Sequence, residues 1–140
     1  MNATGRPSWV RPVILSGVAY FVVGIVFAGL AGASVSHQAR ILWRLAAWVA
    51  AGAVYVTHVA YEHSRLGNPP RPAALHIALA VAVGAFALAG HAIIHSLSTG
   101  SAPGHFLPLA LVIWPVITAL PAFVVALVAG TLLARLPRRA

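Results

Sequence analysis

Long apolar runs separated by short polar connections form the main pattern of this chain. Four runs contain about 20 or more mostly apolar residues, which at about 1.5 Å per residue is long enough for a helix to cross the hydrocarbon core of a bilayer. They cover residues 13–35, 41–63, 73–97 and 107–134. We therefore predict an all-α membrane protein in which four transmembrane helices form a single domain over residues 1–140.

The connections favour an up-down bundle. They cover residues 36–40, 64–72 and 98–107, and links this short place each helix antiparallel beside the next. Residues 67–72 read Gly-Asn-Pro-Pro-Arg-Pro. We expect this segment to be non-helical, because proline disfavours helix in the residue before it. Pro72 suits the first turn of the third helix, and residues 101–104 are expected to form a turn.

Composition supports a location in lipid. The chain has 140 residues, of which 61% are hydrophobic and 7% charged, whereas soluble domains carry about 25% charged residues. The net charge of +8 comes from nine arginines and a single acid, Glu62. The arginines lie at the ends of the apolar runs, so we expect anionic lipid headgroups as partners and no nucleic acid.

The distribution of arginine predicts the orientation. Two arginines, Arg40 and Arg44, belong to the side opposite the N-terminus. Seven belong to the N-terminal side: Arg6, Arg11, Arg65, Arg71, Arg135, Arg138 and Arg139. Because positive residues stay cytoplasmic, both termini are expected inside, in a multi-pass protein of the inner (cytoplasmic) membrane. The first apolar run, about 20 residues long, exceeds the core of a usual signal peptide, so we expect it to be retained.

Small residues indicate where helices approach closely. The first span has small residues at a four-residue spacing, namely Gly24, Ala28 and Gly32. This spacing suits either close helix packing within the bundle or the interface of a homodimer. We expect Gly24 and Gly84 to lie at close helix contacts and Leu88 to face lipid.

A polar stripe runs along the second span. Arg44, Tyr55, His58 and Glu62 share one helical face with Trp48. Exposure of such a face to lipid costs several kcal/mol, so we expect it to face the bundle interior or a wet cavity. The alternative is that Glu62 forms an interfacial pair with Arg65, three residues later.

Histidines in the middle spans are the candidate ligands. His58 and His76 lie at similar depths on adjacent antiparallel helices, as the two axial ligands of a b-type haem would. His91 and His95 lie one turn apart, a spacing that allows two imidazoles to hold one transition metal. His37 and His105 are the only obvious further ligands for that metal. The alternatives are that the histidines tie helices together by hydrogen bonds, or that they carry protons or ions.

Several classes of chemistry are disfavoured. The chain has no cysteine, which excludes thiolate metal sites and disulfides. With one acid, general acid–base catalysis would depend on histidine, and no phosphate-binding loop is present. We therefore expect a non-catalytic accessory or structural membrane subunit, as a homo-oligomer or within a larger membrane complex. The first alternative is a haem or metal redox protein. The second is a small oligomeric transporter that uses Tyr55, His58 and Glu62.

Overall fold

Four long helices make up the part of the chain that the structure describes. The structure is a computed structural model, and it describes residues 9–100 and 107–135. The long helices are α1 (Val10–Ala33), α2 (His37–Tyr61), α3 (Pro70–Thr99) and α4 (Leu107–Arg135), and a short π-helix, η1 (Glu62–Leu66), extends α2. All four are long and apolar enough to cross a membrane. The prediction of an all-α chain with four helices long and apolar enough to span a membrane is confirmed for the described residues, whereas the orientation and the location of the termini stay predictions.

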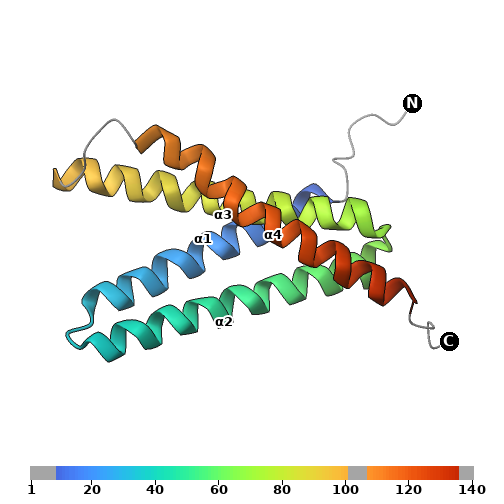
Figure 1. Cartoon of the computed structure of the whole chain (residues 1–140), viewed down its shortest axis with the longest axis horizontal. Coiled ribbons are helices and arrows are strands. Elements are labelled where there is room, and N and C mark those ends of the chain that lie inside the picture. Colours follow the sequence, from blue (N-terminus) through green and yellow to red (C-terminus); the bar gives the residue numbers. More distant parts are fainter. Residues whose placement is uncertain (1–8, 101–106, 136–140) are drawn as a thin grey trace.

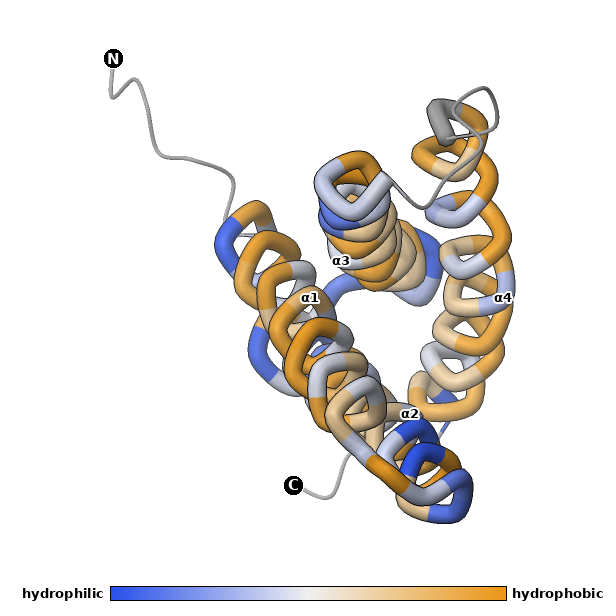
Figure 2. The backbone as a smooth tube through the Cα atoms, turned by 90° about the vertical axis from the view of Figure 1, so that its left-hand side faces the viewer, coloured by the Kyte–Doolittle hydropathy of each residue, from blue (hydrophilic) through white to orange (hydrophobic). Residues whose placement is uncertain are grey.

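Consecutive helices run in opposite directions (Figure 1). We call the end where α1 begins and α4 finishes the N-terminal end of the bundle, and η1 lies there too. Apolar residues extend along the helices, and hydrophilic residues gather toward their ends (Figure 2). This distribution matches the apolar core and polar borders of a bilayer.

The first connection is shorter than expected because Ser36 caps α2. The Ser36 backbone is extended, and its hydroxyl oxygen accepts a 3.1 Å hydrogen bond from the Ala39 N–H. A serine that binds a free N–H of the first turn favours helix immediately after itself. The helix therefore begins at His37, and the expectation of a connection through Arg40 was wrong.

The second connection is also shorter than expected. Gly67 adopts a left-handed conformation with φ of +60° and ends η1, and α3 begins at Pro70. The expectation that residues 67–72 are non-helical was therefore wrong for Pro70, Arg71 and Pro72. Prolines are tolerated in a first helical turn, because the N–H that they lack has no partner there.

The third connection lies largely outside the described residues. The α3 helix continues to Thr99, and Gly100 ends it with φ of +67°. The turn expected at residues 101–104 and the candidate ligand His105 lie outside the described part of the chain.

Glycines bring the helices α1 and α3 close together. A Cβ atom added to Gly84 would lie 2.6 Å from Tyr20 Cβ and 3.0 Å from the Gly17 carbonyl oxygen. Farther along, a Cβ added to Gly24 would lie 2.5 Å from a Leu88 methyl carbon. Leu88 thus covers Gly24, and the expectation that it faces lipid was wrong.

The rest of the small-residue ladder does not join this contact. Ala28 is exposed, and a Cβ on Gly32 would meet no atom within 4 Å. Among the three residues of the predicted ladder, Gly24 alone therefore mediates close helix packing within the described chain.

The helix pair α1–α2 diverges from the pair α3–α4 away from the N-terminal end (Figures 1 and 2). Near the N-terminal end, Tyr55 and Val59 of α2 pack against a buried core of Ala74, Ile77 and Ala126. The Tyr55 hydroxyl also donates a 2.6 Å hydrogen bond to the Ala122 carbonyl oxygen of α4. The helix α2 therefore contacts both α3 and α4 at this end, where its polar residues lie.

Candidate functional site

The only acidic residue of the chain lies at this end of the bundle. Glu62 is the first residue of η1, and it is fully buried. The π-helix continues α2 without a break, so Glu62 stays one turn beyond His58 on the same face. An isolated buried carboxylate is costly, so partners are required.

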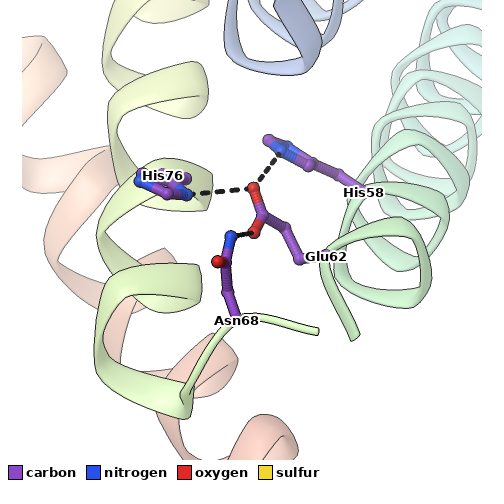
Figure 3. Close-up of polar contacts among 4 residues, drawn as sticks. All are labelled: His58, Glu62, Asn68 and His76. Atoms are coloured by element: carbon purple, nitrogen blue, oxygen red, sulfur yellow. Dashed lines mark hydrogen bonds and ion pairs between the residues drawn. The ribbon is translucent and has the colours of Figure 1, made fainter. Parts of the chain in front are cut away.

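Three side chains surround the Glu62 carboxylate (Figure 3). Its Oε1 lies 3.1 Å from His76 Nδ1 and 3.6 Å from His58 Nε2. Its Oε2 accepts a 2.6 Å hydrogen bond from Asn68 Nδ2. The histidines come from α2 and α3 and the amide from the connection between them, so the cluster joins all three segments. We call His58, Glu62, Asn68 and His76 the carboxylate cluster.

The two histidines have different surroundings. His58 is 3% exposed. Neither of its ring nitrogens has a partner at hydrogen-bond distance, although Nε2 lies within ion-pair range of Glu62. His76 is more open, and its ring stacks on Trp9 with centroids 4.8 Å apart and planes at 7°. Trp9 thereby covers the side of the cluster next to the start of α1.

The matched depth of His58 and His76 correctly predicted that they lie together. The expected pairing of Glu62 with Arg65 was wrong, because Arg65 is exposed and Glu62 turns inward onto the two histidines. Histidine is the only basic partner that reaches the carboxylate among the described residues.

The polar stripe of α2 faces the interior over half its length. Tyr55, His58 and Glu62 point into the bundle, as expected. Arg44 is exposed, and Trp48 is 79% exposed. The expectation was wrong for these two residues, which lie in the first half of α2. The pair α1–α2 diverges from the pair α3–α4 toward that end of the helix (Figure 1).

His91 and His95 lie away from the carboxylate cluster on the exposed part of α3. Their rings are parallel, with centroids 6.4 Å apart, and His91 also meets the Phe21 ring edge-on. Among residues 9–100 and 107–135, no group of three or more His, Asp or Glu side chains is arranged to hold a metal ion. A metal at His91 and His95 therefore stays a prediction without a third ligand among the described residues.

The carboxylate cluster does not fit a haem in this arrangement. Iron held by both imidazoles would lie between the rings. Glu62 Oε1 contacts both His58 and His76 there, so haem ligation requires the carboxylate to move away.

Sequence reasoning did not identify Trp9 and Asn68 as members of this site. Asn68 was expected only to lie in a non-helical connection, and the hydrophobic pattern gave Trp9 no part in a site. Their contacts depend on where α1 and α3 begin, which the hydrophobic pattern does not fix. The signal available for Asn68 was its place within a short connection that follows the only acid of the chain.

A cavity of about 510 Å³ lies beside the carboxylate cluster at the N-terminal end. Asn68 and His63 contribute polar groups to its lining, and Ile77, Ala126 and Gly130 contribute apolar ones. Asn68 both lines the cavity and binds Glu62, so its amide links the cavity lining to the carboxylate.

Comparison of the chain with protein-family models, with curated proteins and with solved structures gives no match. The interpretation of the site therefore depends on its chemistry alone.

Proposed function

We propose that the protein is a small, non-catalytic membrane subunit whose carboxylate cluster binds and releases a proton. The observation that carries this proposal is the contact of one fully buried carboxylate oxygen with two imidazoles. Ionisable residues inside a membrane protein are costly and commonly mark a functional site.

Charge balance supports proton binding. With Glu62 ionised and both histidines neutral, the cluster carries a buried charge of −1, and one added proton neutralises it. A second proton gives a charge of +1. Groups in such close contact exchange protons as a unit rather than as separate residues.

The surroundings limit which groups take part. The α2 helix contributes His58, η1 contributes Glu62 with His63 nearby, and α3 contributes His76. From the start of α1, Trp9 covers His76, and Arg135, the only ionisable residue in the described part of α4, is exposed at its end. The cavity behind Asn68 supplies the route by which protons reach the cluster.

The subunit role is favoured over the two alternatives. A haem protein would need Glu62 to leave its place between the histidines. A transporter would need polar side chains that line the interior of the bundle from one end to the other. Beyond Tyr55, however, the polar stripe of α2 is exposed at Arg44 and Trp48. We further propose that the seven arginines of the N-terminal side are cytoplasmic, which places the cluster near the cytoplasmic surface of the inner membrane.

Nuclear magnetic resonance of the ¹⁵N-labelled imidazoles tests proton binding. Substitution of Glu62→Gln keeps the size of the side chain and removes its charge. We expect it to change the pH dependence of two of the seven histidines, identified by His58→Asn and His76→Asn, and to leave exposed His37 unaltered. Unchanged titration of all seven histidines would contradict the proposal.

Proton flux separates the subunit from the transporter. Liposomes that contain the purified protein and a trapped pH dye should show no flux beyond that of empty liposomes when a pH gradient is applied. Sustained flux in the wild type that Glu62→Gln removes would favour the transporter instead.

A further inference from the structure

A groove of about 620 Å³ separates α1 from α2 at the N-terminal end of the bundle. Its apolar walls include Leu15 and Ala19 of α1 and Ala53 and Val54 of α2. Arg11 and His58 also line the groove. A volume of this size accommodates a substantial part of an amphiphile. The groove therefore combines an apolar trough with one permanent positive charge.

Arg11 has no side-chain carboxylate in this chain with which to pair. It is the second residue of α1 and is exposed, which places it at the level of the membrane surface. The only acidic side chain of the sequence is Glu62, and the histidines and Asn68 surround it. No side-chain carboxylate of this chain is therefore free to complement Arg11, and an anionic ligand would do so.

His58 supplies an independent indication of a ligand. Its ring is buried, its Nδ1 has no hydrogen-bond partner, and the residue lines the groove. It lies in the last turn of α2, before η1 continues the helix to Leu66. An unpartnered polar side chain thus lines the groove below the level of Arg11.

We propose that this groove binds an anionic glycerophospholipid from the leaflet at the N-terminal end. The phosphate lies at Arg11, and one acyl chain follows the apolar walls past His58. This site extends beyond proton binding, and it can be tested through Arg11 and Ala53, which are not members of the carboxylate cluster.

Native mass spectrometry of the delipidated full-length protein tests this proposal. The probe is an equimolar mixture of phosphatidylglycerol and phosphatidylcholine with identical acyl chains. We expect phosphatidylglycerol adducts to exceed phosphatidylcholine adducts about fivefold, the factor for one arginine beside an anionic headgroup. Arg11→Gln should abolish this preference, whereas Arg71→Gln, which changes an exposed arginine outside the groove, should keep it.

A second pair of variants tests the apolar trough. Ala53→Leu fills the groove and should reduce adducts of both lipids, whereas Ala60→Leu, on an exposed part of α2 outside the groove, should not. Equal binding of both lipids by the wild type would overturn the proposal. The same conclusion would follow if Arg11→Gln and Arg71→Gln behaved alike, or if Ala53→Leu bound lipid as the wild type does.

Discussion

The crossing of α1 and α3 gives the most quantitative prediction. In Gly84→Ala, the new methyl carbon would lie 2.6 Å from Tyr20 Cβ and 3.0 Å from the Gly17 carbonyl oxygen. Carbon atoms in ordinary contact are about 3.5–4.0 Å apart, so the two helices must separate by roughly 1 Å. Neither neighbour is the flexible end of a side chain, so a rotamer change cannot relieve the overlap.

The expected cost is about 1–3 kcal/mol, the usual range for an overpacked core. The matched control is Gly29→Ala in α1, where the new carbon would meet no atom within 4 Å. Alanine is favoured over glycine inside a helix by about 0.5–1 kcal/mol, so the control should equal or exceed the wild type in stability.

Reversible unfolding in mixed detergent, followed by circular dichroism, measures both variants. We expect Gly84→Ala to unfold at a clearly lower denaturant fraction than Gly29→Ala. If the two variants unfolded together, α1 and α3 would not be in backbone contact at Gly84, and the described crossing would be refuted.

Two further predictions concern the tie between helices and the orientation. Tyr55→Phe removes the 2.6 Å hydrogen bond to Ala122 and should lower the free energy of unfolding by about 1 kcal/mol. The control Tyr61→Phe changes an exposed tyrosine and should leave the stability unchanged. Equal stability of the two variants would show that the hydrogen bond contributes nothing. Because the chain has no native cysteine, a single cysteine introduced by Gln38→Cys or Ser64→Cys shows on which side of the membrane that position lies. A membrane-impermeant thiol reagent added outside cells should label position 38 and leave position 64 unlabelled. The reverse labelling would contradict the orientation inferred from the arginines.

The helices were predictable because their main determinant is length. Each apolar run had to span the hydrocarbon core, so all four helices appear within a few residues of their predicted positions. Their ends were less predictable, since they depend on local chemistry. The cap at Ser36 and the tolerance for Pro70 and Pro72 in a first turn lengthened α2 and α3 beyond the apolar pattern.

The meeting of His58 and His76 was predictable from depth alone. Antiparallel neighbours joined by a short connection bring residues at equal distances from that connection to the same level. Asn68 and Trp9 were not predictable in this way, because they belong to the connection and to the start of α1. Hydrophobic periodicity says nothing about side chains in such positions.

Helical periodicity also misplaced Arg44, Trp48 and Leu88. A stripe defines one face of a helix, but it does not show how far along that face a neighbouring helix stays in contact. Divergence of the two helix pairs left Arg44 and Trp48 exposed. In α3, alanine and glycine occur all around the helix, so the pattern did not reveal that Leu88 covers Gly24.

The most direct test of proton binding uses the fact that Glu62 is the only acidic side chain. With ¹³C-labelled glutamate, pH-difference infrared spectroscopy reports the carboxyl of Glu62 alone. We expect the Glu62 signal and the histidine bands to change together as pH is lowered, and His76→Asn to shift the Glu62 change to a different pH. A Glu62 signal that stays constant at every pH at which the protein is folded, with histidine bands identical in Glu62→Gln, would show that the cluster only ties the helices together.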